Sequence, residues 1–312
     1  MERLASDDAR TTKSLTPHTP NTTMQSPRAQ NRQACEHCNE RRYQTFVAKS
    51  SNGLFSLAQA KICPHCHEEC QRCEDEGFIF IKDNRGYRYA APCPDCAPMR
   101  QRIKAFNDSH IPAHYREKTF ENFERTTSNM GRIHLDLFRY ANSFLPGDKG
   151  FLLHGPPGGG KTHLMSAFIH RITLEKGINA RFVEFSHLLS SLRLQFDQGK
   201  GDTAIILPLV EVEVLAIDEL GKGVNNEWQL SVLDELISKR YNLGRTTLFT
   251  SNYQIRPDKF KYSDVANDDI RRITRETLAE RIGDRIFSRL FEMTSFIHVD
   301  APDFRKNKLR VI

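Results

Sequence analysis

The run G-P-P-G-G-G-K-T at residues 155–162 has the residue types and spacing of a loop that holds a phosphate chain. The apolar run Phe151–His154 before it predicts a buried strand, and the apolar segment Leu164–Ile169 after it predicts a helix. A glycine-rich turn in that setting aims backbone N–H groups at one anion, and the helix N-terminus adds partial positive charge. We therefore expect a nucleotide site made of Gly155, Pro156, Pro157, Gly158, Gly159, Gly160, Lys161, Thr162 and His163.

Hydrolysis of a nucleotide bound at such a loop needs an acidic side chain beside the Mg²⁺ and a second group that positions the attacking water. Lys161 is placed to reach the β- and γ-phosphates of ATP, and the Thr162 hydroxyl to hold Mg²⁺. The apolar strand predicted at 212–217 runs directly into Asp218 and Glu219. We expect Asp218 beside the Mg²⁺ and Glu219 where it polarises the attacking water. An acidic pair on the surface after a strand is the alternative interpretation.

A polar amide follows the next predicted strand. The β-branched run at 246–250 leads into Ser251 and Asn252. Ligands of parallel sheets collect at the carboxyl ends of the strands, so Asn252 is a candidate site residue. An ordinary turn asparagine is an equally good interpretation of this position.

The cysteines indicate a second kind of chemistry, because all eight lie in the first third of the chain as C-x-x-C pairs. The four pairs are Cys35/Cys38, Cys63/Cys66, Cys70/Cys73 and Cys93/Cys96. One C-x-x-C turn presents two thiolates to a tetrahedral metal, and a second turn completes the set. Taken in order, the pairs predict two four-cysteine Zn²⁺ sites, both structural because no position is left for a substrate. Interleaved pairing, an iron–sulfur cluster, or a ligand from His37, His65 or His67 stay open as alternatives.

The sequences between paired cysteine turns predict β-hairpins. Residues 77–82 and 87–90 are apolar runs around the turn 83–86, and 42–48 and 54–57 flank a similar polar turn. Each hairpin would bring two cysteine turns together, as in a zinc ribbon.

Composition and motif order divide the chain into four segments. We expect a disordered tail at 1–33, an eight-cysteine zinc-binding module at 34–98, a linker or lead-in at 99–118 and an ATPase domain at 119–312. Predicted strands lie at 150–154, 180–184, 212–217, 246–250 and 295–299, and predicted helices at 131–144, 161–176, 186–196 (capped by Ser186), 227–243 and 276–291. This alternation predicts an α/β fold, a parallel sheet covered by helices on both faces.

The bulk composition limits the cellular setting. A net charge of +6 permits contact with nucleic acid without requiring it. The sequence has no apolar run near the roughly 20 residues of a spanning helix, and its first residues are too polar for a secretory signal. We expect a protein that makes no membrane contact and lies in the cytoplasm, where thiols stay reduced.

The motifs together resemble one family. In order, G-P-P-G-G-G-K-T-H-L, L-A-I-D-E-L-G, T-S-N, S-R-L-F-E and P-D-F-R resemble the DnaC/DnaI helicase loaders, AAA+ ATPases related to the IstB transposition helpers. The lead-in at 111–123 is also similar, so the resemblance spans about residues 99–312. It implies a P-loop AAA+ sheet.

The resemblance also implies roles for residues beyond the loop. Asn252 matches the sensor-1 residue that helps orient the water, and Arg305 matches a sensor-2 arginine that reaches the phosphates in cis. Arg289 matches the arginine finger given in trans to a neighbouring subunit, where a guanidinium stabilises the charge of the transition state. Arg281 and Arg285 are rivals for that role, because four-residue spacing on one helix would place all three arginines on a shared face.

The function implied by the resemblance is ATP-dependent loading of the replicative DNA helicase. The implied partners are that helicase, single-stranded DNA and further copies of the ATPase domain. Basic residues beside aromatics, at Arg193 near Phe196 and at Lys259–Tyr262, fit contact with a single strand. The alternative interpretation of each is an exposed charge next to a surface aromatic residue. One alternative is an IstB-like helper that acts with a transposase on duplex DNA. Another is a zinc-ribbon DNA-binding adaptor whose nucleotide is only structural.

Overall fold

A five-stranded parallel sheet forms the centre of the computed structural model, which describes residues 35–49, 55–197, 203–255 and 277–304. Its strands are β5 (Gly150–His154), β6 (Ala180–Glu184), β7 (Val214–Asp218), β8 (Thr246–Ser251) and β9 (Thr294–His298). They lie in the order β6-β7-β8-β5-β9, and every ladder is parallel. All residues of β7 and β8 are buried, as expected of apolar strands covered on both faces.

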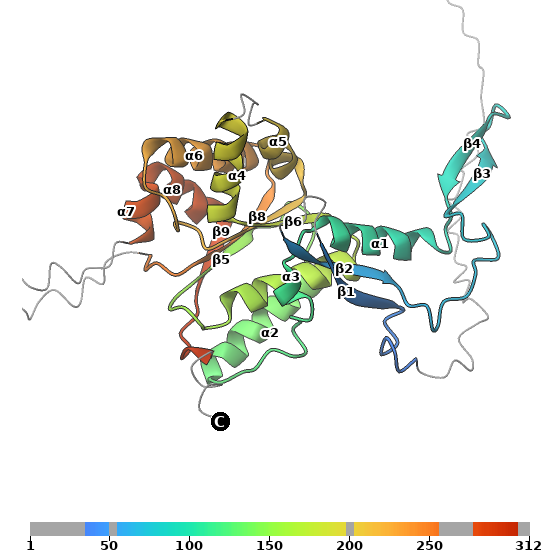
Figure 1. Ribbon diagram of the computed structural model, residues 1–312, viewed down its shortest axis with the longest axis horizontal. Coiled ribbons are helices and arrows are strands. Elements are labelled where there is room, and N and C mark those ends of the chain that lie inside the picture. Colours follow the sequence, from blue (N-terminus) through green and yellow to red (C-terminus); the bar gives the residue numbers. More distant parts are fainter. Residues whose placement is uncertain (1–34, 50–54, 198–202, 256–276, 305–312) are drawn as a thin grey trace, which may run out of the picture. The chain divides into compact units, whose positions relative to one another are not determined.

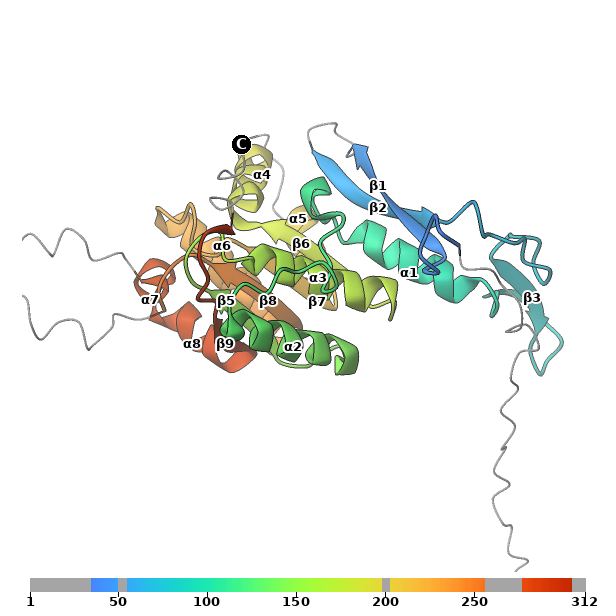
Figure 2. The same ribbon diagram turned by 90° about the horizontal axis from the view of Figure 1, so that it is seen from below.

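Helices cover both faces of this sheet, as Figures 1 and 2 show. On one face lie α1 (Ala97–Asp108), α2 (Ser128–Ser143) and α3 (Lys161–Leu174), whose apolar residues share one core with Phe151 and Leu153. The opposite face carries α4 (Phe185–Asp197), α5 (Thr203–Glu211), α6 (Glu227–Asn242), α7 (Leu278–Ile282) and α8 (Asp284–Met293). These helices pack around a second core that includes Leu152 and Ile217. The predicted parallel sheet with helices on both faces is therefore confirmed.

Two antiparallel hairpins precede the sheet. They pair β1 (Tyr43–Lys49) with β2 (Ser56–Ile62), and β3 (Phe78–Lys82) with β4 (Arg88–Pro92). Both lie in the segment for which zinc-ribbon-like hairpins were predicted.

The first hairpin packs directly on the sheet domain. The Ala58 N–H donates to the Ile111 carbonyl at 2.8 Å, and Leu57 forms a bridge with Pro112 just before the short 3-10 helix η1 (Ala113–Tyr115). Asn107 of α1 hydrogen-bonds both backbone groups of Ala60. Because Ala58 and Ala60 are buried in the same core as α1 and α3, this hairpin is part of the wall that supports the sheet domain.

Two local predictions were wrong, and one helix was not predicted. The helix expected over 276–291 is two helices, because Gly283 adopts φ 79° and interrupts the hydrogen-bond ladder between α7 and α8. Ser186 does not cap α4, which begins one residue earlier; its hydroxyl donates to Glu184 Oε1 at 2.7 Å. Helix α5 was not predicted, since Pro208 interrupts an otherwise apolar run. Among the described residues, no helix is long and apolar enough to cross a membrane.

Candidate nucleotide site and cysteine clusters

The glycine-rich loop follows β5 and ends at the first residue of α3. Gly160 caps that helix with φ 84°, and a Cβ there would lie 2.9 Å from the Phe123 ring. Gly158 has φ 82°, and a Cβ there would lie 2.0 Å from Asp303 Oδ1 and 2.8 Å from the Asp303 Cα. Both positions therefore require glycine, for backbone conformation and for close approach. The loop has the shape of a cradle into which phosphate oxygens fit.

Lys161 is buried at the floor of this cradle. Its Nζ donates to the Gly155 carbonyl at 2.9 Å and to the Pro156 carbonyl at 2.8 Å. These contacts keep the ammonium beside the loop, where a phosphate chain would attract it. The loop and Lys161 together fit the triphosphate of a nucleotide.

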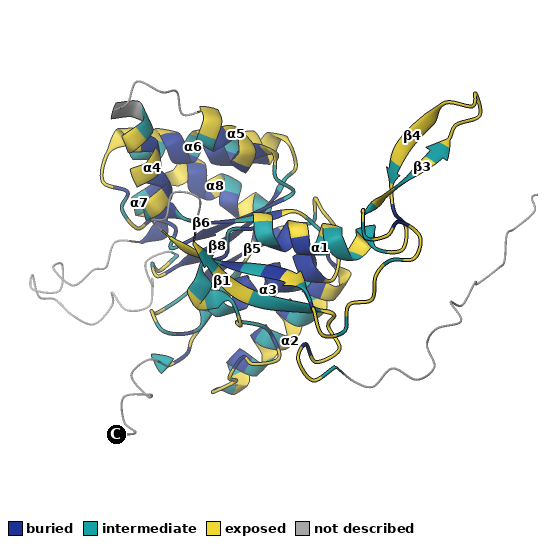
Figure 3. Cartoon of the chain, turned by 45° about the vertical axis from the view of Figure 1, so that its right-hand side comes forward, coloured by how far each residue is buried: buried dark blue, intermediate teal, exposed yellow. Residues whose placement is uncertain are grey.

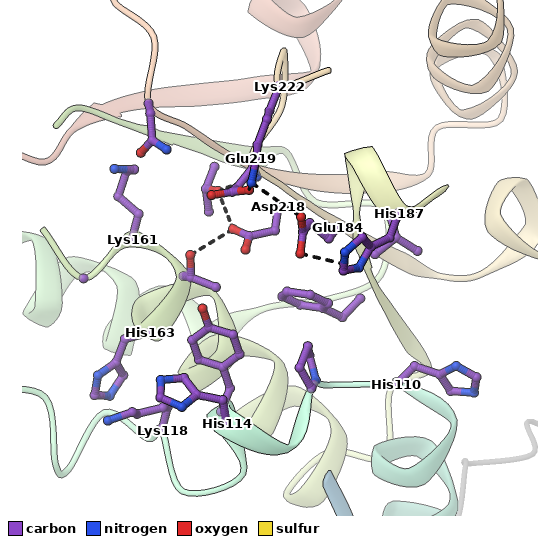
Figure 4. A pocket seen from close by; sticks show the side chains of 18 of the residues that line it. His110, His114, Lys118, Lys161, His163, Glu184, His187, Asp218, Glu219 and Lys222 are labelled. Atoms are coloured by element: carbon purple, nitrogen blue, oxygen red, sulfur yellow. Dashed lines mark hydrogen bonds and ion pairs between the residues drawn. The ribbon is translucent and has the colours of Figure 1, made fainter. Parts of the chain in front are cut away.

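Thr162 and Asp218 meet across the sheet edge. The Thr162 hydroxyl donates to Asp218 Oδ1 at 3.0 Å, and the Thr250 hydroxyl donates to the same oxygen (Figure 4). Burial raises the pKa of Asp218 to about 6, although both hydroxyl contacts oppose that rise. A hydroxyl and a carboxylate at this spacing are the oxygen ligands that Mg²⁺ takes beside nucleotide phosphates, so the pair fits that ion.

Glu219 follows at the end of β7 in an unusual backbone conformation. Its φ of 57° is in the left-handed region, and its N–H donates to the Thr250 hydroxyl at 3.0 Å. Its carboxylate is paired with Lys222, whose Nζ also lies 3.7 Å from Glu184 Oε1. The hydrogen bond and charge of Glu219 raise the pKa of Lys222. In this arrangement the carboxylate that was expected to polarise water is engaged by a cation.

A cavity of about 990 Å³ connects these groups. The residues that line it include all of the loop from Pro157 to His163, as well as Asp218, Glu219 and Asn252. Tyr115 lines the same cavity; burial raises the pKa of its hydroxyl, and a hydrogen bond with Thr162 opposes the rise. The structure therefore gathers the candidate residues around one space large enough for a nucleotide.

Four residues of this site were not identified from the sequence. Tyr115 lies in the lead-in at 111–123 and Thr250 in the motif T-S-N, so the sequence indicated their neighbourhood but not their contacts. Glu184 and Lys222 carry no sequence signal, because only the fold places the end of β6 beside the residues after β7.

The arginines of α7 and α8 lie elsewhere. Arg289 donates to Asp234 Oδ1 at 2.6 Å, and Arg285 lies 3.6 Å from Asp234 Oδ2 with 74% of its side chain exposed. Arg281 donates to the Gly221 carbonyl at 2.7 Å and stands over the Tyr253 ring. The prediction that all three arginines share one helix face is wrong, because the helix is interrupted at Gly283 and Arg281 lies on α7. None of the three is among the residues lining the cavity.

Three predicted features lie outside the residues that the structure describes. They are the tail at 1–33, the run Lys259–Tyr262 and Arg305. The segment before Arg305 is visible, and there the Phe304 N–H donates to the Gly158 carbonyl at 3.2 Å.

The eight cysteines form two clusters, and the clusters group the pairs in the predicted order. One contains Cys35, Cys38, Cys63 and Cys66, and the other Cys70, Cys73, Cys93 and Cys96. Among the described residues, no histidine joins either cluster: His37 stacks on His65 with ring centroids 3.7 Å apart, and His67 contacts Asp75.

The sulfur spacing tests whether a metal fits. Sulfur atoms on facing turns are 3.9 and 3.6 Å apart in the first cluster and 3.7 and 3.5 Å apart in the second. A disulfide would require about 2 Å. A tetrahedral Zn²⁺ with Zn–S bonds of about 2.3 Å separates its ligands by about 3.8 Å. Both clusters therefore fit Zn²⁺. Burial raises the pKa of Cys93, but hydrogen bonds with the backbone of Cys96 and Asp95 and with the thiols of Cys73 and Cys70 lower it to about 7.

The two clusters share a further feature. The residue before the last cysteine of each turn contacts its counterpart on the facing turn: His37 stacks on His65, and Arg72 Nε lies 2.8 Å from Asp95 Oδ2. One pair of side chains therefore links the two facing turns of each cluster.

Comparison with known proteins agrees with this geometry. A family model described as "IstB-like ATP binding protein" matches residues 97–289. The replicative helicase loader DnaC of Escherichia coli K12 is 23% identical over 179 residues, 57% of this chain and 72% of that protein. DnaC of Buchnera aphidicola subsp. Baizongia pistaciae is 25% identical over 159 residues, 50% of this chain and 64% of that protein. A putative insertion sequence ATP-binding protein of Sinorhizobium fredii is 31% identical over 146 residues, 46% of this chain and 47% of that protein.

One solved structure is similar at the level of the whole sheet domain. The crystal structure of the DnaC helicase loader aligns with a TM-score of 0.51 and 27% sequence identity. The alignment covers 60% of this chain and 99% of that one.

Proposed function

The chain belongs to the family of IstB-like ATP binding proteins, and on that premise we propose that it is an ATP-dependent loader of the replicative DNA helicase. In this proposal it binds the helicase in the cytoplasm and helps to place it on single-stranded DNA when replication begins. The observation that carries the proposal is the alignment with the DnaC helicase loader, because nearly all of that chain is matched. The residues before α1, which hold the cysteine clusters, lie before the family match begins.

We assign ATP hydrolysis to the cavity beside the loop. When bound, Mg²⁺-ATP supplies the scissile phosphate and neutralises the charge on its oxygens. The loop N–H groups and Lys161 hold the phosphate chain, and Thr162 and Asp218 provide the oxygen ligands for the ion. Glu219 accepts the proton of the attacking water once its carboxylate leaves Lys222. Asn252 lines the same cavity and orients that water.

The remaining positive charge comes from another copy of the chain in this proposal. None of Arg281, Arg285 and Arg289 is among the residues that line this cavity, which supports a donor in trans. Arg289 is our candidate, and Asp234 holds it in place in a single chain. Hydrolysis would therefore occur at a boundary between subunits and would require self-association through the ATPase domain.

The cysteine clusters have a structural role in this proposal. Each cluster would hold one Zn²⁺ with four thiolates, which leaves no coordination position for chemistry. We assign residues 34–98 to a zinc-binding module that meets the helicase, after a tail at 1–33 and before a lead-in at 99–118 and an ATPase domain at 119–312.

The experiment is association with the helicase. Purified full-length chain, loaded with Zn²⁺, is mixed with hexameric replicative helicase in ATP, in ADP or without nucleotide, and complexes are separated by size. We expect a complex whose yield depends on ATP, and the Lys161→Ala variant to lose that dependence. If the two proteins never co-elute under any of these conditions, helicase loading is excluded.

A second function is favoured by one comparison. The insertion sequence protein of Sinorhizobium fredii has the higher identity, 31%, over its shorter match. That match favours a helper that assembles on duplex DNA with a transposase. ATP-dependent filaments on duplex DNA, seen by electron microscopy in the absence of helicase, would favour this function over loading.

A further inference from the structure

The second hairpin carries a face on which every residue is exposed. Successive strand residues point to opposite faces, and register partners share a face, so the β3–β4 register defines its members. That face, called here the hairpin face, consists of Phe78, Phe80, Lys82, Arg88, Ala90 and Pro92. All six are exposed. In Figure 3, β3 and β4 accordingly carry yellow, exposed segments.

The aromatic rings on the hairpin face do not serve a core. Phe80 is 62% exposed and Phe78 40% exposed, and their rings meet edge to face at 5.7 Å. The first hairpin contrasts with this, because Ala58 and Ala60 of β2 are buried against α1. Side chains as large as phenylalanine gain stability only when covered, so two exposed rings side by side indicate a binding surface.

The charges on the hairpin face are of one sign. Lys82 and Arg88 are register partners, and none of the six residues is acidic. Asp83, in the turn after β3, accepts hydrogen bonds from the N–H groups of Arg85 and Tyr87 and so closes the turn. The six residues of this face therefore present cations beside aromatic rings and include no carboxylate.

One cation lies directly against a ring. The Arg88 guanidinium stands 5.7 Å from the centroid of the Phe80 ring. An unpaired nucleotide offers a flat base to a ring and a phosphate to a neighbouring cation, and proteins that bind single strands combine these two contacts. Protein–protein interface centres instead are depleted in lysine, so Lys82 favours a polyanion as the occupant.

We propose that the hairpin face binds single-stranded nucleic acid, with bases stacked on Phe78 and Phe80 and phosphates held by Lys82 and Arg88. The inference deepens the proposed function, since it gives the single strand a site on the second hairpin. It does not depend on the nucleotide site.

The test uses the full chain with two bound Zn²⁺ and a fluorescent oligothymidylate of about 20 nucleotides, which exceeds a typical site size. Fluorescence anisotropy gives the dissociation constant. We expect Phe80→Ala to weaken binding about five- to 150-fold, the loss of one stacked base. Phe46→Ala is the matched control, because Phe46 is an exposed ring on the first hairpin with Lys61 5.8 Å from its centroid. It is expected to bind within about twofold of wild type.

A second variant keeps the proposal testable if Phe80→Ala loses zinc or stability. Lys82→Gln is expected to lower the slope of log affinity against log salt by about 0.7, the value for one single-strand phosphate contact. Unchanged affinity and slope in Phe80→Ala and Lys82→Gln would overturn the proposal. So would Phe80→Ala losing helicase association while keeping oligonucleotide affinity, which would make the face a protein interface. Wild type that binds the oligonucleotide but never the helicase would contradict helicase loading and leave this inference supported.

Discussion

The Thr162 hydroxyl and the Asp218 carboxylate are joined by a hydrogen bond of 3.0 Å, although 56 residues separate them in the chain. The bond connects the first turn of α3 with the end of β7, and Thr250 of β8 reaches the same oxygen. Three elements of the sheet domain therefore converge on a carboxylate that is 5% exposed. A buried carboxylate in such a setting is costly when ionised and becomes favourable when it holds a cation.

The first prediction concerns that cost. The folded-state pKa of Asp218, about 6, lies above its ordinary value of 3.8, so the folded chain binds this proton more tightly than the unfolded chain. The free energy of unfolding that this proton contributes is therefore fully present at low pH and is lost as the pH rises from about 4 to 6. Asp218→Asn should therefore raise the free energy of unfolding without nucleotide, by up to about 3 kcal/mol at pH 8 and about half as much at pH 5. Urea unfolding at both pH values measures this.

The same variant should lose Mg²⁺-dependent ATP hydrolysis, because the amide carries no charge for the ion. Asp136→Asn, on the exposed side of α2, is the control and should change neither quantity. Equal unfolding free energies for wild type and Asp218→Asn at pH 8 would show that this carboxylate is not penalised by burial.

A second prediction concerns Lys222, which pairs with Glu219 and approaches Glu184. Lys222→Met releases the Glu219 carboxylate, so ATP turnover of the chain without helicase should rise. We expect a rise of about two- to fivefold, which corresponds to the free energy of one exposed ion pair. Lys222→Arg should stay near wild type. Lys239→Met removes a lysine of similar exposure that pairs with Glu235, and it should have no effect. Slower turnover in Lys222→Met would mean that Lys222 assists hydrolysis instead of restraining it.

The two cysteine clusters give a third prediction, because the first hairpin is packed against η1 and Tyr115. Cys63→Ser should lower both the thermal midpoint and the affinity for a fluorescent ATP analogue. Cys93→Ser disrupts an equally buried thiol of the second cluster and should leave ATP affinity within about twofold. Each variant should bind one Zn²⁺ fewer than wild type. Equal losses of ATP affinity in both would contradict the separate roles of the clusters.

The fourth prediction concerns Arg240, whose side chain is fully buried and, among the described residues, has hydroxyl and carbonyl partners but no carboxylate. It donates to the carbonyls of Leu209, Val212 and Thr246, which ties α5 and β8 to α6. Arg240→Met leaves these buried carbonyls without donors, so the free energy of unfolding should fall by about 3 kcal/mol or more. Arg139→Met, an exposed arginine on α2, serves as control and should fall by less than about 0.5 kcal/mol. A small effect of Arg240→Met would mean that water replaces the guanidinium.

Local patterns were enough to predict the sheet and the grouping of cysteines. The strand before Gly155 and the strand before Asp218 are short apolar runs with polar ends, and C-x-x-C spacing fixes two thiolates within one turn. The contacts of Tyr115 and Lys222 could not be predicted, because they depend on how β2 packs on η1 and how β6 ends beside β7. The break at Gly283 was missed because the residues around it keep helical spacing, and only backbone conformation reveals the interruption.

The most direct test of the account is a mixing experiment with two variants that should be inactive alone. Glu219→Gln lacks the base, and Arg289→Ala lacks the finger that we assign to the neighbouring subunit. Mixed together with Mg²⁺-ATP, they should regain a substantial part of wild-type turnover, since an intact Glu219 can then meet an intact Arg289 across a shared boundary. Full turnover by Arg289→Ala alone, or no recovery in the mixture, would contradict hydrolysis at a subunit interface.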